Sequence, residues 1–297
     1  AATTLRRSEY SVRQGALLSI ATAIEDRQEE ILAANQRDVS RERAGGMSES
    51  LLDRLTLNPA RIAGIAGGAR KVAALEDPLG VTLRNRTLEN GLQLKQMTVP
   101  FGVVGMVYEA RPNVTVDAAV ILLMSGNAAL LRGSSSAQES NQVLVTVMRE
   151  ALQGTSINPD VIQLVPSDDR DSVRALLHAR GKVDLVIPRG SAALIRRVVD
   201  EALVPTIETG AGVCHVYVDK DADLDKALPI LVNSKTHRPS VCNAAETLLI
   251  HEDVFPTFAP RALKALSEAG VRLHGDLETL KAARELGINI IEATDAD

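Results

Sequence analysis

The stretch Val103-Val-Gly-Met-Val-Tyr108-Glu-Ala-Arg-Pro-Asn-Val-Thr-Val-Asp117 opens the pattern that decides the fold. A short apolar run, typical of a buried strand, leads into a helix expected near residues 117–124. Further strands are expected at residues 128–131, 161–165 and 184–187, and further helices at 136–152 and 172–178. Strand–helix alternation of this kind predicts right-handed crossovers and an α/β fold with a mostly parallel sheet. Such sheets bind ligands at the carboxyl ends of their strands.

The segment before this stretch is predicted to be a helical layer. Four apolar residues have the spacing of one helical stripe: Leu17, Ile20, Ile24 and Ile31. Gly45-Gly46 interrupts the helical pattern. Asn58-Pro59 then combines an N-cap residue with a proline at the first helical position, which predicts a further helix. Nothing in this layer points to chemistry.

Residues 81–99 are predicted to form a β-hairpin. Asn90-Gly91 is a strong turn signal, and the leucines behind it alternate with polar residues. The exposed edges of such a two-stranded excursion favour a partner.

A second strand–helix series follows Thr206. Strands are expected at 213–218 and 246–250, helices at 223–234 and 255–269, and a further strand beginning at 288–291. The restart predicts two domains, residues 1–205 and 206–297.

Composition excludes several functional classes. The 297 residues carry a net charge of −5 and six aromatic side chains, which disfavours nucleic acid and anionic membranes as partners. The longest uncharged stretch, 118–131, is too short for the roughly 20 residues of a membrane span. No leader sequence opens the chain, and two cysteines cannot form a disulfide framework, so we expect a reducing compartment such as the cytoplasm.

Two strand-to-helix junctions have the composition of phosphate sites. The first is Arg132-Gly133-Ser134-Ser135-Ser136 and the second is Pro188-Arg189-Gly190-Ser191. Exposed N–H groups and the positive end of a helix would attract an anion at each junction. The alternative is that these serines only cap helices. The dinucleotide fingerprint is incomplete at Gly210-Ala-Gly212, but two such junctions on one sheet favour a dinucleotide.

The two thiols differ in their surroundings. Cys214 lies in an apolar run and is interpreted as a buried structural thiol. Cys242 lies in a predicted loop near Lys235, His237 and Arg238, whose charges would favour the thiolate, so a nucleophile and an inert thiol are both open. Zinc binding by Cys214, His215, His237 and Cys242 is disfavoured, because adjacent strand residues point to opposite faces.

Three segments carry a resemblance to a known family. Residues 99–117 resemble the characteristic region of the γ-glutamyl phosphate reductase family, within the aldehyde dehydrogenase superfamily. Residues 212–219, and residues 238–243 with 246–249, are also similar to that family. The resemblance implies an aldehyde dehydrogenase-like fold with a parallel-sheet cofactor domain, an α/β catalytic domain and an oligomerisation hairpin at about 81–99. It also implies that the catalytic domain is incomplete at the C-terminus of this chain.

The same resemblance assigns residues to roles. Cys242 matches the catalytic nucleophile, and Asn113 matches the asparagine whose amide helps to form the oxyanion hole. Arg132, Gly133, Ser134 and Ser135 match the stretch that holds the adenosine ribose, and Gly190 and Ser191 match the helix start under the pyrophosphate. Arg111, Lys235 and Arg238 are candidates for binding the carboxylate and phosphate of the substrate.

The implied reaction is reduction of L-glutamate 5-phosphate by NADPH to L-glutamate 5-semialdehyde, with release of phosphate, in proline biosynthesis. Arg132 favours NADPH over NADH because it would attract the 2′-phosphate, whereas Glu139 argues against it. The reaction in this direction needs no activated water and therefore no base to activate it. Glu208 could be a general base or simply a carboxylate in a turn. No metal is expected.

A homo-oligomer and functional coupling to a glutamate 5-kinase are the partners that the resemblance suggests. Two other classes remain open: an aldehyde-oxidising dehydrogenase of the same superfamily, and a non-catalytic truncated homologue. The end at Asp297 leads us to expect that NADPH binding is retained better than catalysis or oligomerisation.

Overall fold

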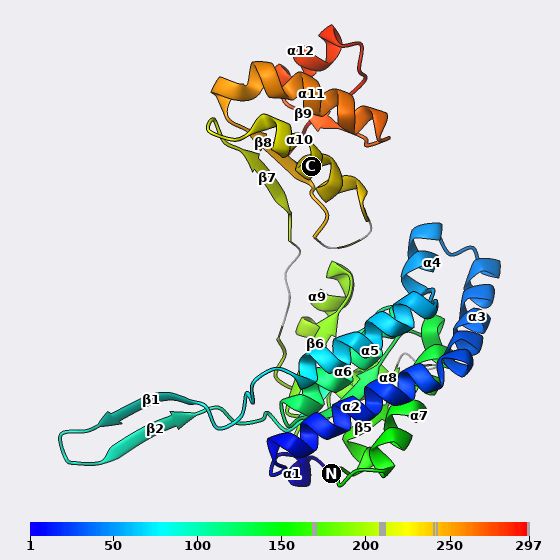
Figure 1. Cartoon of the computed structure of the whole chain (residues 1–297), viewed down its shortest axis with the longest axis vertical. Coiled ribbons are helices and arrows are strands. Elements are labelled where there is room, and N and C mark those ends of the chain that lie inside the picture. Colours follow the sequence, from blue (N-terminus) through cyan, green and yellow to red (C-terminus); the bar gives the residue numbers. More distant parts are fainter. Residues whose placement is uncertain (168–170, 208–211, 240, 242, 296–297) are drawn as a thin grey trace. The chain divides into compact units, whose positions relative to one another are not determined.

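The computed structural model describes residues 1–167, 171–207, 212–239, 241 and 243–295 (Figure 1). The chain divides into two compact units, Ala1–Gly210 and Ala211–Asp297. The boundary predicted from the sequence lies at residue 205. Cys242 and Glu208 lie outside the described residues.

The first unit begins with a helical layer. Its helices are α1 (Ala2–Leu5), α2 (Tyr10–Asp26), α3 (Gln28–Ala44), α4 (Glu49–Leu55) and α5 (Pro59–Ala73). The predicted cap of α5 is confirmed, since the Asn58 side chain accepts a hydrogen bond from the N–H of Arg61. The single stripe through Ile31 is wrong as a description of one helix, because the chain breaks at Arg27 between α2 and α3. All four stripe residues are nevertheless fully buried.

The predicted hairpin is present as β1 (Thr82–Thr87) and β2 (Gln93–Met97), an antiparallel pair joined across Asn90-Gly91 (Figure 1). Every residue of both strands is exposed. Its large apolar side chains are between 44% and 59% exposed: Leu83, Leu94 and Met97 in the strands and Leu92 in the turn.

A four-stranded parallel sheet forms the centre of the first unit. It consists of β3 (Val103–Tyr108), β4 (Ala128–Arg132), β5 (Ile162–Leu164) and β6 (Leu185–Arg189), in the order β5-β4-β3-β6. The predicted parallel α/β sheet is therefore confirmed. Its register aligns Val107 with Arg132 and Tyr108 with Arg189, so three strands end at one edge.

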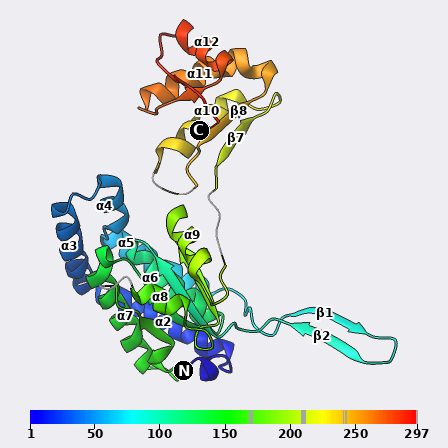
Figure 2. The ribbon, with the colours of Figure 1, turned by 180° about the vertical axis from the view of Figure 1, so that it is seen from behind.

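Helices cover both faces of this sheet (Figures 1 and 2). They are α6 (Pro112–Met124), α7 (Gln138–Gln153), α8 (Asp171–Leu177) and α9 (Ala192–Glu201), with short 3₁₀ turns η1 (Ser135–Ala137) and η2 (Pro159–Val161). Val104 faces a large core shared with α2, α5, α6 and α7. Val107 faces a smaller core shared with α8 and α9. This division gives a three-layer arrangement.

The second unit repeats the strand–helix alternation on a smaller scale. Its elements are β7 (His215–Val218), α10 (Leu224–Thr236), β8 (Thr247–Ile250), η3 (Glu252–Val254), α11 (Phe255–Glu268), β9 (His274–Gly275), α12 (Leu277–Glu285) and β10 (Ile291–Glu292). β7 pairs with β8 and β10 with β9, each in parallel. The strand expected at 288–291 is wrong in extent, because only Ile291 of that run lies in a strand.

In the described part of the chain, no helix is long and apolar enough to cross a lipid bilayer.

Candidate active site

The strand order contains a topological switch point between β3 and β6. β4 and β5 follow β3 on one side, whereas β6 lies on the other side of β3. Connections from β3 and β6 therefore diverge at their carboxyl ends, and α/β sheets bind ligands at such a switch point. Here the N–H of Glu109 donates to the Arg189 carbonyl across 3.3 Å. Both predicted phosphate junctions and Asn113 follow strands that end at this edge.

At the first junction, β4 leads into η1 and then into α7. Ser134 is half-buried and its Oγ accepts from the Ser136 N–H at 3.2 Å, while Ser135 is exposed. The Arg132 guanidinium contacts Ser172 Oγ at 3.2 Å and the Gly133 carbonyl at 2.9 Å. Arg132 thus joins the start of α7 to the start of α8.

A buried carboxylate occupies the start of α7. Asp38, from α3, is fully buried and accepts from the N–H and Oγ of Ser140 at 2.8 and 2.7 Å, and from the N–H of Glu139 at 3.3 Å. These N–H groups are therefore already satisfied. At Glu139 and Ser140 the helix start therefore does not present free N–H groups to an anion, because a side chain about 100 residues earlier in sequence caps them.

Gly133 is required by packing. A Cβ atom at this position would lie 2.2 Å from the Asn141 side-chain nitrogen and 3.0 Å from the Tyr108 ring. Thr115 Oγ1 donates to Asn141 Oδ1 at 2.7 Å and lies 2.8 Å from the Tyr108 hydroxyl. Burial raises the pKa of Tyr108, which keeps its hydroxyl protonated. This network fixes β3, α6 and α7 around Gly133.

At the second junction, a carboxylate again meets a helix start. Glu109 Oε1 accepts from the Ser191 N–H at 2.9 Å, and Ser191 Oγ accepts from the Leu194 N–H at 3.4 Å. A Cβ at Gly190 would lie 2.7 Å from the Glu109 carboxyl carbon. The Ser191 N–H is therefore also occupied, contrary to the expectation, but by a half-exposed side chain that makes one hydrogen bond within the described part of the chain.

Asn113 lies in the first turn of α6. The helix begins at Pro112, five residues before the expected start at 117, so Asn113 is inside the helix and Arg111 is its N-cap. The Asn113 Nδ2 donates to Asp117 Oδ2 at 3.0 Å. Burial raises the pKa of Asp117, and the hydrogen bond from Asn113 partly offsets this effect.

Glu139, the acidic residue that argued against NADPH, is engaged by two arginines of α3. It forms an ion pair with Arg37, and its Oε1 lies 3.6 Å from Arg41. Arg41 also donates to the carbonyls of Ser135 and Ser136 at 3.1 and 3.2 Å. Two cations thus accompany the carboxylate at this junction. Sequence reasoning missed them because they lie about 100 residues earlier.

The second unit holds the remaining candidates. Cys214 precedes β7 and is half-buried, so the prediction of a buried strand thiol is wrong; its carbonyl accepts from the N–H groups of Glu246 and Thr247. Lys235 is half-buried near the end of α10, and Arg238 is exposed beyond it. Arg111 is half-buried in the first unit. Among the described residues, no group of three or more His, Cys, Asp or Glu side chains could hold a metal.

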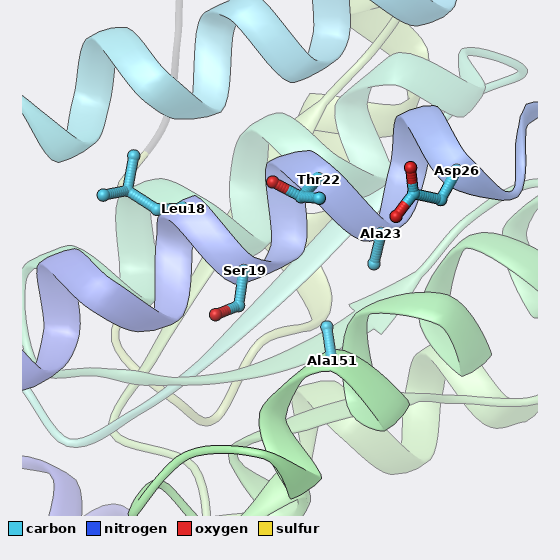
Figure 3. Close-up of a pocket in the computed structure, with 6 residues that line it drawn as sticks. All are labelled: Leu18, Ser19, Thr22, Ala23, Asp26 and Ala151. Atoms are coloured by element: carbon cyan, nitrogen blue, oxygen red, sulfur yellow. The ribbon is translucent and has the colours of Figure 1, made fainter.

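A surface hollow between α2 and α7 is separate from this edge. It is lined by Leu18, Ser19, Thr22, Ala23, Asp26 and Ala151 (Figure 3). Ala151 lies near the end of α7, whereas the sheet edge lies at its start. Asp26 is its single ionisable lining residue among those described, so the hollow offers little chemistry.

Comparison with known proteins identifies the class. The family model for the aldehyde dehydrogenase family matches residues 1–279. The chain belongs to the aldehyde dehydrogenase family, and the prediction of an oxidoreductase of this family is confirmed. Membership implies a nicotinamide cofactor.

The relatives narrow the class further. The chain is 52% identical to the gamma-glutamyl phosphate reductase of Thermobifida fusca, across 100% of this chain and 70% of the relative. It is 54% identical to the enzyme of that name from Kineococcus radiotolerans, across 99% of this chain and 68% of the relative. The crystal structure of gamma-glutamyl phosphate reductase from Thermotoga maritima matches with a TM-score of 0.89 and 40% identity, covering 99% and 70% of the two chains. The predicted resemblance to this family is confirmed.

Proposed function

We propose that the chain catalyses NADPH-dependent reduction of L-glutamate 5-phosphate to L-glutamate 5-semialdehyde with release of phosphate, a step of proline biosynthesis. The observation that carries this proposal is the identity of 52–54% to gamma-glutamyl phosphate reductases over 99–100% of the chain. The structure of the first unit supports it, because Asn113 and both phosphate junctions meet at one sheet edge.

Cys242 is the proposed nucleophile. Its thiolate attacks the acyl carbon of the substrate, and the C–O bond to phosphate breaks, so that inorganic phosphate leaves and a thioester remains. The Asn113 amide donates a hydrogen bond to the oxyanion that forms during this attack. Arg111, Lys235 and Arg238 are the proposed partners of the substrate carboxylate and phosphate.

The first unit has features that fit a dinucleotide. Arg132, Gly133, Ser134 and Ser135 would hold the adenosine ribose, and Gly190 and Ser191 would hold the pyrophosphate once Glu109 turns away. When bound, NADPH supplies the hydride that reduces the thioester to the aldehyde and frees the thiol. The pairing of Glu139 with Arg37 and Arg41 supports NADPH over NADH, because it offsets the negative charge of Glu139, which would otherwise repel a 2′-phosphate.

The hairpin supports a homo-oligomer. A two-stranded hairpin is marginally stable alone, and the leucines and Met97 of this one are exposed in the single chain. We propose that a second copy covers it. A cytoplasmic location and functional coupling to a glutamate 5-kinase belong to the same proposal.

The decisive assay is the reverse reaction. Glutamate semialdehyde should reduce NADP⁺ only when phosphate is added, and Cys242→Ala should abolish turnover while Cys214→Ala retains it. Acid formation without phosphate would instead indicate an aldehyde-oxidising dehydrogenase. Cofactor binding without turnover, whether phosphate is present or absent, would indicate a non-catalytic homologue.

Cofactor choice has its own test. Arg132→Ala should reduce the preference for NADPH over NADH by roughly tenfold, since a charge-assisted contact is worth about 1.5–3 kcal/mol. Binding of both cofactors to wild type and variant is measured by fluorescence titration. Equal affinities of the wild type for the two cofactors would contradict the assignment.

A further inference from the structure

The side-chain amide of Asn113 is oriented by a hydrogen bond to Asp117, which lies one turn further along the same helix. We propose that Asp117 is a positioning residue: it fixes the Asn113 amide so that one N–H stays free for the oxyanion. This inference rests on the proposed role of Asn113.

The geometry of the pair selects one orientation of the amide. Asn113 Nδ2 donates to Asp117 Oδ2 at 3.0 Å within α6. An ionised carboxylate only accepts hydrogen bonds, whereas an amide has two N–H donors and one carbonyl acceptor. Turning the amide over would place its carbonyl oxygen against the carboxylate, which is repulsive. The pairing therefore uses one N–H and leaves the second available.

The carboxylate is itself held by its surroundings. Its neighbours in sequence, Val116 and Ala118, are 0% and 6% exposed and belong to the main core. On the side of α5, Asp117 Oδ1 lies 4.0 Å from the position that a Cβ of Gly68 would take, so the carboxylate lies beside α5. Asp117 is thus half-buried beside α5 on a helix whose backbone is fixed by the core, and its hydrogen bond orients the Asn113 amide.

Stability alone does not explain a carboxylate here. Among the described residues, the hydrogen bond from Asn113 is the one recorded for the Asp117 side chain, and no cation pairs with it. Burial raises the pKa of Asp117, which means that the ionised form is disfavoured in the folded protein. An uncharged residue would avoid this cost at neutral pH, so the carboxylate is not the residue that burial alone would favour.

The test is a double-mutant cycle read as kcat and KM in the phosphate-dependent assay. Asn113→Ala should lower kcat by about 10²–10³-fold, as removal of an oxyanion donor does. Asp117→Ala should lower kcat by about tenfold or more with KM nearly unchanged, because a misdirected donor loses transition-state stabilisation. In the double variant, loss of Asp117 should add nothing to the loss of Asn113. Asp117→Asn should restore part of the activity, since its carbonyl oxygen can accept from Asn113.

Folding is controlled separately. Thermal unfolding of Asp117→Asn should match or exceed that of the wild type. Asp117→Leu supplies an apolar group of similar size in case the alanine variant is unstable, and it should lose kcat in the same way. Gln36→Ala is the matched control: it removes an amide-to-oxygen bond of the same helical spacing, to Ser40 on α3, and should leave kcat unchanged.

Three outcomes overturn the inference. Full activity of Asp117→Ala beside an inactive Asn113→Ala removes the positioning role and leaves the proposed function intact. Losses that add fully in the double variant show that Asp117 acts independently of Asn113. Full activity of Asn113→Ala removes the proposed oxyanion role and the positioning role together.

Discussion

The N–H groups at the starts of α7 and α9 are both capped by a carboxylate, but the two carboxylates differ in burial and in the number of their partners. Each receives a carboxylate from another element: Asp38 at α7 and Glu109 at α9. Asp38 is 0% exposed, is engaged by Ser140, Glu139 and Arg41, and cannot leave without exposing buried donors. Glu109 is half-exposed, and to the described residues its side chain makes one hydrogen bond, from the Ser191 N–H.

A helix start whose N–H groups are capped by a side chain can bind an anion only if that side chain moves away. Composition made both junctions look alike, since each offers a cation, a glycine and serine before a helix. The structure separates them: a fully buried carboxylate caps the N–H groups of Glu139 and Ser140 at α7, whereas a half-exposed carboxylate caps the Ser191 N–H at α9. We therefore expect an anion to displace the carboxylate more readily at α9 than at α7.

The largest effect is expected from removal of the buried carboxylate at α7. Asp38→Ala should lower the free energy of unfolding by about 2–4 kcal/mol, because it removes a helix cap and leaves buried donors unsatisfied. Asp38→Asn keeps an acceptor and should lose less. Urea denaturation followed by circular dichroism measures both. A loss below about 0.5 kcal/mol for the alanine variant, the level of ordinary surface changes, would contradict a structural cap.

Alanine substitutions at Gly133 and Gly190, one glycine at each junction, are expected to have effects of intermediate size on stability. Gly133→Ala should cost about 1–3 kcal/mol of stability, because its Cβ would overlap the buried Asn141 amide. Gly190→Ala should cost less, because two of the three nearest atoms belong to the half-exposed Glu109 side chain, which can move, and the third is Leu194 Cδ2 at 2.9 Å. Unfolding midpoints of the two variants provide the readout. The reverse order would mean that Glu109 is as fixed as Asp38.

The smallest expected effect concerns the half-exposed carboxylate at α9. Glu109→Gln should lower the Kd for NADPH about two- to fivefold, because it removes a negative charge worth about 0.3–1 kcal/mol from the helix start that the pyrophosphate would use. Stability should change little. Glu150→Gln, which removes an exposed carboxylate paired with Arg27, is the control for overall charge. Weaker binding to Glu109→Gln would instead identify Glu109 as part of the cofactor site.

Sequence reasoning located strands and helices well where the signal is local. The bounds predicted for β3 are those of the structure, and the Asn58 cap sits where its residue type predicts. The errors fall where tertiary structure decides. One apolar stripe crosses the break at Arg27 because residues of both helices are buried in the same core. Ile288 and Ile290 are apolar but do not pair in a strand.

The candidate site was only partly predictable for the same reason. The residues near the strand ends follow from the parallel alternation, since carboxyl ends meet at one edge. Asp38, Arg37 and Arg41 carry no local signal, because they reach the start of α7 from about 100 residues away. Asp117 lies in the same motif as Asn113, but the hydrogen bond between their side chains forms only because α6 begins at Pro112 and includes both residues.

The order of the strands also has a consequence for how the chain folds. Val103 pairs with Ala128, 25 residues later (128 − 103), whereas Val104 pairs with Leu185, 81 residues later (185 − 104). Closing the longer loop costs about 1 kcal/mol more chain entropy, by the logarithmic dependence on loop length. β3, α6 and β4 can therefore associate early, and β6 joins from afar. The contact of Glu109 with the start of α9 is then among the later ones to form, so the sheet edge where we propose the cofactor site is completed only when the sheet is.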